Sequence, residues 1–331
     1  MGSPRLTTSG IVITHDASFS VIKFGTKNNN PVNTMVVSKM EPLSGIITAL
    51  VTPFTETGEL KTEAIQPLID FQIKGGVDGL FLCGTAGLGS VMRTDQRVMM
   101  FKESAKAARG RIKLLAHVGA PSTEEAVILA RAAESAVVDA LGAVPPYFMK
   151  PDEESIIKHF KTVAEASKLP LYIYNIPGQA VNAVTPAMML KLAQIPNIRG
   201  VKDSSRDFIN LLNYLQVLPE DFTVICGSDS YIYPAMVMGA RGAITGYANG
   251  FPDVYADFLR VIRSGDQDAA KRKQFELNVL RGKLQKPPLA PHYEALRLRG
   301  VDAGVPRAPL RGMTEKERVE FKESLMKLGV L

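Results

Sequence analysis

Residues 171–218 read LYIYNIPGQAVNAVTPAMMLKLAQIPNIRGVKDSSRDFINLLNYLQVL. This stretch repeats one pattern twice: a short, nearly continuous apolar run, then a segment whose apolar residues recur at helical spacing. Leu171–Ile176 precedes a helix predicted over Pro186–Ala193, and Ile198–Lys202 precedes one over Phe208–Leu218. Apolar runs of this kind are typical of parallel strands that are covered on both faces. The stretch therefore predicts two strand-then-helix units of a parallel sheet.

The same unit recurs on both sides of this stretch. The predicted strands are Gly45–Phe54, Gly79–Gly84, Lys113–Gly119, Leu141–Pro145, Leu171–Ile176, Ile198–Lys202, Phe222–Gly227 and Gly242–Tyr247, each followed by a helical pattern. Eight such units favour a closed (β/α)8 TIM barrel over an open doubly wound sheet. A dinucleotide-binding fold would also need a glycine-rich turn after its first strand, where this chain has Thr52-Pro53-Phe54.

Two segments flank the predicted barrel, which spans residues 44–266. After it, helical patterns at 268–286, 291–300 and 314–328 predict a C-terminal helical segment, residues 267–331, that is appended to the barrel. Before it, residues 1–43 lack the basic start and sustained apolar core of a secretory signal. We interpret residues 1–43 as a leader that is disordered, derived from cloning, or placed before an internal start codon.

Composition restricts the class of protein. The net charge is +6, but the excess lies in the late helices mixed with acids, which favours a solvated helix face over a nucleic-acid site. No apolar run reaches the roughly 20 residues that span a bilayer, so no membrane partner is expected. Cys83 and Cys226 cannot form a disulfide framework, and the histidines are scattered without a metal-ligand spacing. We expect a reduced, cytoplasmic protein without a metal.

Polar residues follow the predicted strands at the end of the barrel where catalytic groups lie. Lys202 ends an apolar strand, where its side chain would be partly removed from water. Removal from water disfavours the charged form of an amine, and the neutral amine can attack a ketone. Alternatively, Lys202 is a strand-end lysine without a catalytic role, whose side chain reaches solvent. Tyr174 is either a core aromatic or a proton-transfer group. Thr85 lies in Gly84–Gly89, which is either an anion-binding turn or only a tight turn.

Four motifs together resemble one family. They are Gly84-Thr85-x-Gly87, Tyr174-Asn175-x-Pro177, Gly200-Val201-Lys202 and Gly227-Ser228-Asp229. In order and spacing they are similar to those of the dihydrodipicolinate synthase and N-acetylneuraminate lyase superfamily, and the resemblance covers about Gly45 to Leu331. The turn Gly87-Leu88-Gly89 most resembles that of archaeal 2-keto-3-deoxygluconate aldolases.

The resemblance implies a mechanism and a set of site residues. Pyruvate or another 2-keto acid would form a Schiff base on Lys202 without a cofactor, Tyr174 would shuttle protons, and the Thr85 hydroxyl would join that relay. An aldehyde would be the other partner, and the assembly would be a homotetramer, a dimer of dimers. The substrate-binding residues implied are Thr85 and Ala86 through their N–H groups, the main chain of Ile244, Asp229 and Gln179.

Two positions depart from the family pattern. Phe148 stands where many members have a tyrosine contributed across the tight dimer. Gln179 stands where the synthase has an arginine for the carboxylate of aspartate semialdehyde, and a neutral amide binds a carboxylate less strongly than a guanidinium does. Arg206, shortly after Lys202, is an alternative source of a cation.

These residues predict a class I lyase that cleaves a 2-keto-3-deoxy sugar acid reversibly into pyruvate and an aldehyde. Gln179 makes aspartate semialdehyde the poorer partner in this interpretation. Three alternatives remain open. One is dihydrodipicolinate synthase, which joins pyruvate to aspartate semialdehyde in lysine biosynthesis, and another is a keto-acid dehydratase on the same Schiff base. The third is a non-catalytic, ligand-binding regulatory barrel. The joint presence of Lys202, Tyr174 and Thr85 argues against this third alternative.

Overall fold

The computed structural model describes residues 12–16, 19–23 and 42–331. The chain divides into two compact units, residues 1–42 and 43–331. In the first unit, strands β1 (Val12–Asp16) and β2 (Phe19–Lys23) form an antiparallel pair with Val12 opposite Lys23. The rest of the leader predicted over residues 1–43 lies largely outside the described residues.

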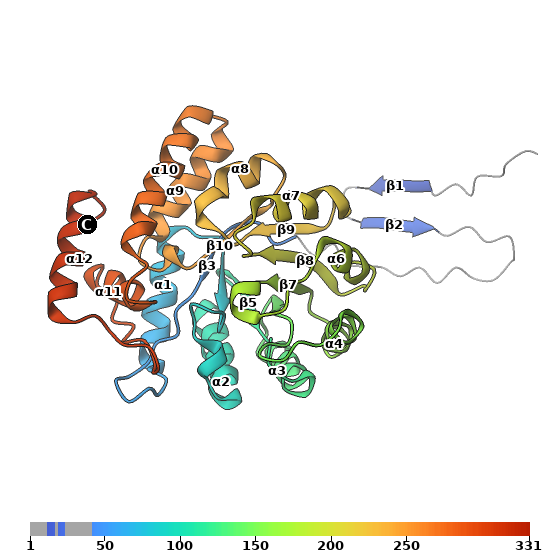
Figure 1. The fold of residues 1–331 in the computed structure, drawn as a ribbon, viewed down its shortest axis with the longest axis horizontal. Helices are drawn as coiled ribbons and strands as arrows, with labels where there is room; N and C mark the ends of the chain where they lie inside the picture. The colour runs from blue at the N-terminus through green and yellow to red at the C-terminus, as the bar shows by residue number, and fades with distance from the viewer. Residues whose placement is uncertain (1–11, 17–18, 24–41) are drawn as a thin grey trace, which may run out of the picture. The chain divides into compact units, whose positions relative to one another are not determined.

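The second unit contains a closed barrel of parallel strands that runs in chain order from β3 to β10 and pairs β10 with β3 (Figure 1). This arrangement confirms the predicted (β/α)8 TIM barrel. The strands are β3 (Gly45–Ala49), β4 (Gly79–Leu82), β5 (Lys113–His117), β6 (Ala140–Ala143), β7 (Leu171–Asn175), β8 (Ile198–Asp203), β9 (Thr223–Cys226) and β10 (Gly242–Thr245).

Helices surround the strands, and α10 to α12 lie together at one side of the barrel (Figure 1). The barrel helices begin at side-chain caps where the sequence offers them; Ser122, for example, accepts the N–H of Glu125 at 3.2 Å. The helices are α1 (Ile65–Gly75), α2 (Thr94–Ala108), α3 (Thr123–Ser135), α4 (Glu153–Glu165), α5 (Pro177–Ala180), α6 (Pro186–Leu192), α7 (Phe208–Val217), α8 (Ile232–Val237), α9 (Pro252–Ser264), α10 (Gln267–Lys283), α11 (Ala290–Leu298) and α12 (Glu315–Lys327). Short 3-10 turns are η1 (Thr62–Ala64), η2 (Gly89–Val91), η3 (Asp229–Tyr231) and η4 (Tyr247–Asn249).

The seam between β10 and β3 closes the barrel. A Cβ on Gly242 would lie 2.1 Å from the carbonyl oxygen of Gly45, so only glycine allows the two strands to approach here. The buried side chain of Asn249 then bridges the seam, because its Oδ1 accepts the N–H of Val51 at 3.0 Å and its Nδ2 donates to the carbonyl of Ala49 at 2.8 Å. The seam is therefore held by the side chain of a single asparagine in addition to the ladder.

Strand β3 ends at Ala49, although the apolar run predicts a strand to Phe54. Beyond Ala49 the chain leaves the ladder, because the N–H of Val51 bonds to the Asn249 side chain and Pro53 has no N–H to donate. The residues remain buried as a loop, so burial and not strand pairing explains the apolar run.

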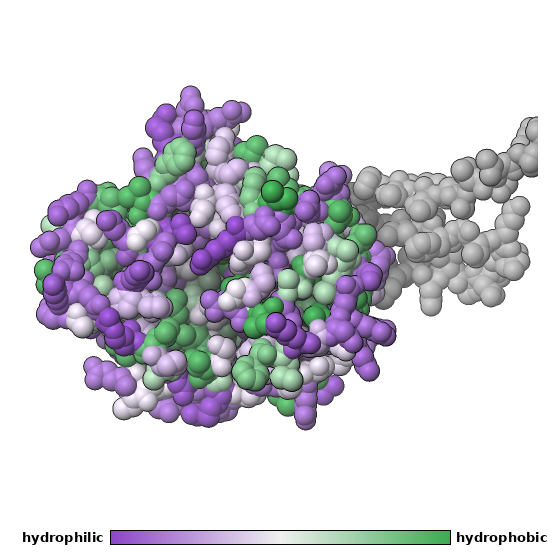
Figure 2. All heavy atoms as spheres, viewed as in Figure 1, coloured by the Kyte–Doolittle hydropathy of each residue, from purple (hydrophilic) through white to green (hydrophobic). Residues whose placement is uncertain are grey.

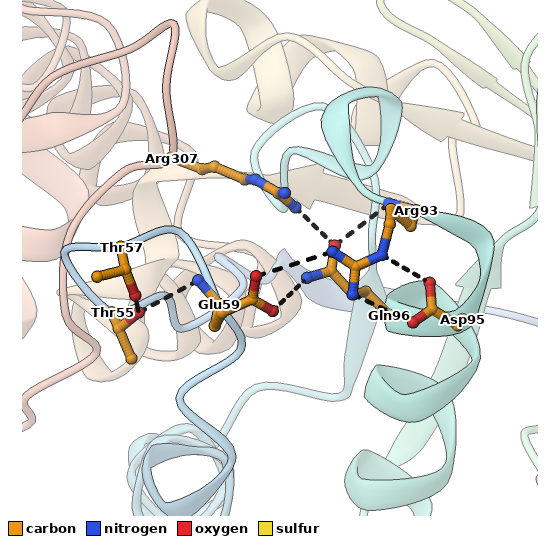
Figure 3. Close-up of polar contacts among 7 residues, drawn as sticks. All are labelled: Thr55, Thr57, Glu59, Arg93, Asp95, Gln96 and Arg307. Carbon is orange, nitrogen blue, oxygen red and sulfur yellow. Dashed lines mark hydrogen bonds and ion pairs between the residues drawn. The ribbon is translucent and has the colours of Figure 1, made fainter.

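The C-terminal segment packs on the rim of the barrel, as Figure 3 shows for one cluster of contacts. Gln96, at the start of α2, accepts a hydrogen bond from Arg307 at 2.6 Å and donates one to Glu59 at 3.0 Å. Its side chain also accepts the N–H of Arg93 at 3.2 Å. One buried amide thus joins two barrel loops to the chain beyond α11.

The face drawn in Figure 2 is mainly hydrophilic, with hydrophobic residues in small groups. Among the helices that the structure describes, none combines the length and the apolar character needed to cross a membrane. Both cysteines are buried free thiols, and burial raises the pKa of each to about 12.

Asn249→Leu should lower the free energy of unfolding by about 3 kcal/mol or more, because it leaves buried main-chain groups of Val51 and Ala49 without partners at roughly 1–3 kcal/mol each. Asn213→Leu, on the exposed face of α7, is the control and should change stability by no more than about 0.5 kcal/mol. Urea unfolding followed by circular dichroism measures both. Equal stability losses in the two variants would show that Asn249 does not hold the seam.

Candidate active site

Lys202 and Tyr174 lie side by side at the C-terminal ends of neighbouring strands. They are paired in register on β8 and β7, and both side chains are buried. The Lys202 Nζ atom lies 3.8 Å from the centroid of the Tyr174 ring and 5.0 Å from that of Phe81. Within the described part of the chain, no carboxylate lies within 4 Å of this amine. The amine is thus held between aromatic rings at the mouth end of the barrel.

The hydroxyl of Tyr174 contacts Thr85, which lies in the turn after β4. The Tyr174 oxygen and the Thr85 Oγ1 atom are 3.2 Å apart, and either can donate the hydrogen bond. The Tyr174 ring is fixed by edge-on contacts with Phe81 and His117, with ring centroids 5.7 and 6.0 Å apart. The structure therefore brings together the amine, the phenol and the threonine hydroxyl that the sequence predicts as a set.

The turn after β4 presents two unused N–H groups. Its backbone is left-handed at Cys83 and Leu88, and a Cβ on Gly89 would lie 1.8 Å from the Cys83 carbonyl oxygen. Gly89 donates to the Gly84 carbonyl, while no residue of the described ranges accepts from the N–H of Thr85 or Ala86. This geometry fits a small anion such as a carboxylate.

Asn175 and Asp203, which neighbour the two site residues in sequence, serve the scaffold. Asn175 donates to Asp203 at 2.8 Å and accepts the N–H of Val184 at 3.0 Å, and Ser205 donates to Asp203 at 2.8 Å. Burial raises the pKa of the Asp203 carboxyl, and these hydrogen bonds act against that rise. The pair ties the end of β7 to the end of β8 and so sets the position of Lys202 relative to Tyr174.

His117 and Arg97 belong to the surroundings of the site, although in the sequence His117 is only one of several scattered histidines. Both are buried, and Arg97 donates to the carbonyl of His117 at 2.5 Å and to that of Gly119 at 3.1 Å. Burial, followed by the charges of Arg97 and Lys202, lowers the pKa of His117 well below its ordinary value, so the ring is neutral. The sequence did contain a signal for His117. It lies two residues after Leu115 on β5, and because side chains alternate along a strand, both point into the barrel.

The other predicted residues are distributed around the mouth. Ile244 is buried on β10, and Gln179 is exposed on α5. The buried Asp229 carboxylate accepts hydrogen bonds from Thr245 at 2.5 Å and Tyr255 at 2.7 Å through its Oδ1 atom, so half of the group is already used within the protein. Phe148 is 86% exposed.

Comparison with known proteins gives a consistent result. The family model described as "Dihydrodipicolinate synthetase family" matches residues 42–328. The 4-hydroxy-tetrahydrodipicolinate synthase of Neisseria meningitidis serogroup B is 34% identical over 291 residues, which cover 87% of this chain and 100% of that protein. These matches confirm the resemblance that the four sequence motifs indicate.

Solved structures agree. A protein of the dihydrodipicolinic acid synthase family from E. coli K12, in complex with pyruvate, has a TM-score of 0.83 at 29% identity and covers 87% of this chain and 99% of its own. A catalytic lysine mutant of the Ruminococcus gnavus sialic acid aldolase has a TM-score of 0.83 at 26% identity and covers 86% of this chain and 95% of its own.

Proposed function

The chain belongs to the dihydrodipicolinate synthetase family, and from this membership we propose that Lys202 binds pyruvate or a related 2-keto acid as a Schiff base. The enzyme then makes or breaks a carbon–carbon bond between the keto acid and an aldehyde. The observation that carries the proposal is the buried Lys202 amine, 3.8 Å from the centroid of the Tyr174 ring, whose hydroxyl is 3.2 Å from Thr85.

The chemistry follows from the properties of an iminium. The Lys202 amine, after losing a proton, adds to the C2 carbonyl, and loss of water gives the iminium. In the cleavage direction, a base removes the proton of the C4 hydroxyl, the C3–C4 electron pair moves into the iminium, and an aldehyde leaves. The resulting enamine is protonated at C3, and water then hydrolyses the iminium to release pyruvate and the free lysine.

Tyr174 is the proposed proton carrier in these steps. Its hydroxyl lies 3.2 Å from Thr85 and its ring centroid lies 3.8 Å from the Lys202 amine, so a proton from the carbinolamine or the C4 hydroxyl would have a short route through the Tyr174–Thr85 pair. The unused N–H groups of Thr85 and Ala86 are the proposed donors to the keto-acid carboxylate, and the Ile244 main chain is proposed to line the same site.

Two aldehydes are candidates for the second substrate. The relatives carrying the name 4-hydroxy-tetrahydrodipicolinate synthase favour the synthase reaction, with aspartate semialdehyde as the partner. Gln179 and the Gly87-Leu88-Gly89 turn instead favour cleavage of a 2-keto-3-deoxy sugar acid to a hydroxyaldehyde. The Schiff base is common to both reactions, so tests of Lys202 and Tyr174 do not depend on this choice.

Borohydride added with pyruvate should attach a reduced pyruvyl group to Lys202, because reduction makes the iminium a stable secondary amine. Intact-mass measurement gives the stoichiometry and peptide mapping gives the position. Lys150, outside the barrel strands, should stay unmodified and provides the internal control. A label on any other lysine, or no label at all, refutes the mechanism.

Tyr174→Phe should reduce kcat by roughly 10²- to 10⁴-fold, the usual contribution of a general acid–base group, while the ring contacts are retained. The matched control is Tyr172→Phe, two residues earlier on β7, whose hydroxyl accepts the N–H of Leu43. Steady-state kinetics and the melting temperature are measured for both. Unchanged turnover in Tyr174→Phe would remove Tyr174 from the relay.

Turnover should survive dialysis against EDTA with less than about a twofold loss, because the iminium accepts the electron pair that a metal ion accepts in other lyases. Pyruvate release before and after chelation is the measurement. A large loss that zinc or magnesium restores would contradict Schiff-base catalysis as the sole source of activation.

A further inference from the structure

His292, near the start of α11, is a buried imidazole that the scaffold does not use. Its side chain is 5% exposed, and its Nδ1 atom is fully buried without a hydrogen-bond partner. No described residue bonds to its Nε2 atom either. Burial lowers the pKa of His292 to about 4, so at neutral pH the ring is uncharged and has one N–H donor and one acceptor nitrogen. An unpartnered buried polar group destabilises a fold, so packing alone does not account for this imidazole.

The helix that carries His292 is fixed to the turn Gly84–Gly89 after β4. The next residue, Tyr293, donates its hydroxyl to the carbonyl of Thr52 at 2.8 Å. The Thr52 hydroxyl in turn donates to the carbonyl of Gly87, within that turn, at 2.6 Å. Both donor side chains are buried. The start of α11 therefore has a defined position relative to the turn.

Helix α11 also packs against the loop after β10. A Cβ on Gly250, which follows η4, would lie 2.5 Å from the Cβ atom of Ala295, so the two segments approach closely. The rings of His292 and Tyr247 have centroids 5.3 Å apart and are tilted by 54°. The imidazole is thus held between the loop after β10 and the turn after β4.

Gly246, directly after β10, leaves a space in front of the imidazole that a methyl group would fill. A Cβ on Gly246 would lie 3.9 Å from the His292 Nε2 atom and 3.5 Å from the Ala86 Cβ atom, which are ordinary contact distances. The backbone of Gly246 has φ of −78° and ψ of −25°, which any residue adopts without strain. The missing side chain therefore leaves room and does not serve a special backbone conformation.

The turn and the imidazole together offer three hydrogen-bond donors around this space. They are the N–H groups of Thr85 and Ala86 and the N–H of His292, and none of them has an acceptor within the described part of the chain. No carboxylate of the described residues bonds to these groups. Converging donors without an acceptor are suited to an anion. A carboxylate can accept from all three, because its two oxygens offer about four lone-pair positions.

We propose that His292 donates its Nε2–H to the carboxylate of the keto acid, beside the N–H groups of Thr85 and Ala86. This inference rests on the Schiff-base function proposed above and adds a substrate-binding residue from the C-terminal helical segment. The fully buried Nδ1 is then the unprotonated nitrogen. An uncharged donor binds the carboxylate without placing a second positive charge near the iminium on Lys202, which a like charge would disfavour.

His292→Leu should raise the pyruvate concentration that gives half-maximal borohydride trapping on Lys202 about tenfold, the usual effect of losing one hydrogen bond to a charged group. The extent of trapping at saturating pyruvate should not change, because the lysine itself is intact. His292→Gln keeps an N–H donor and should lie within about threefold of the unmodified protein. Intact-mass measurement after reduction over a series of pyruvate concentrations gives each value. Equal losses in the two variants would assign His292 to packing and overturn the contact.

Gly246→Ala tests the space itself, because the added methyl group would lie between the Nε2 atom and the carboxylate. It should raise the half-maximal pyruvate concentration about tenfold in the unmodified background. In the His292→Leu background the rise should be below about threefold, since no hydrogen bond is left to block. Fully additive effects, or unchanged pyruvate binding in Gly246→Ala, overturn the contact. This variant also decides the question if His292→Leu does not fold, which its melting temperature shows.

His159→Leu is the matched control. His159, on α4, is also buried with an unpartnered Nε2 atom, and burial lowers its pKa to about 4 as well. Its Nδ1 atom, however, is 2.9 Å from the hydroxyl of Thr123 on α3, in the layer of helices outside the barrel. The half-maximal pyruvate concentration should stay within about twofold in this variant. A tenfold rise would show that loss of any buried imidazole weakens pyruvate binding, which overturns the specific role of His292.

Calorimetric titration with pyruvate separates this inference from the Schiff base, because it reports carboxylate binding whether or not an iminium forms. The dissociation constant should rise about tenfold in His292→Leu. A missing trap in the unmodified protein, together with this rise, would refute the Schiff base and support the carboxylate contact. A normal trap with equal dissociation constants in the two proteins would retain the Schiff base and overturn the contact. No binding of pyruvate to the unmodified protein would overturn both.

Discussion

The closure of the parallel barrel at the β10–β3 seam is the constraint on which the rest of the structure depends. Asn249 fixes that seam by bonding to Val51 and Ala49, nearly 200 residues earlier in the chain. Only a closed ring of strands places the end of β4 across from the ends of β7 and β8. The contact of Thr85 with Tyr174 is a consequence of that closure, whereas Tyr174 and Lys202 meet because β7 and β8 are paired neighbours.

Several residues in the loops at the mouth of the barrel have unfavourable backbone conformations. Cys83, Leu88, Phe148 and Arg206 are non-glycine residues with positive φ, and each lies in a loop that follows a barrel strand. Each such residue costs about 1–2 kcal/mol, and a packed scaffold is what maintains it. The strands supply the buried amine and phenol, while the strained loops supply N–H groups and exposed cations.

The fold was predictable because strand-then-helix units leave a strong pattern in apolar spacing. The strand predicted to end at Phe54 ends at Ala49, because an apolar run indicates burial and cannot distinguish a strand from a buried loop. Lys202 and Tyr174 were identifiable as neighbours because strand ends meet at one edge of a parallel barrel. Their catalytic roles, the homotetramer and the cytoplasmic location stay predictions.

Other parts of the site were not predictable from spacing. Arg97 lies on a helix where a charged residue normally faces solvent, yet it is buried against His117. Gln274 joins the appended helix α10 to the loop after β9 by donating to the carbonyl of Asp229, and no local pattern encodes such a contact. Asp229 was identifiable as a polar strand-end residue, but its bonds to Thr245 and Tyr255 depend on tertiary packing.

The Asn249 bridge has a consequence for the chain during its synthesis. Its two ends are 200 residues apart, and ribosomes add about 5–20 residues per second, so β3 waits roughly 10–40 s for β10. During that interval one side of β3 is an unpaired edge, and unpaired edges of apolar strands are where chains aggregate. The nascent barrel is therefore most vulnerable on its first strand, and the arrival of its last strand ends that exposure.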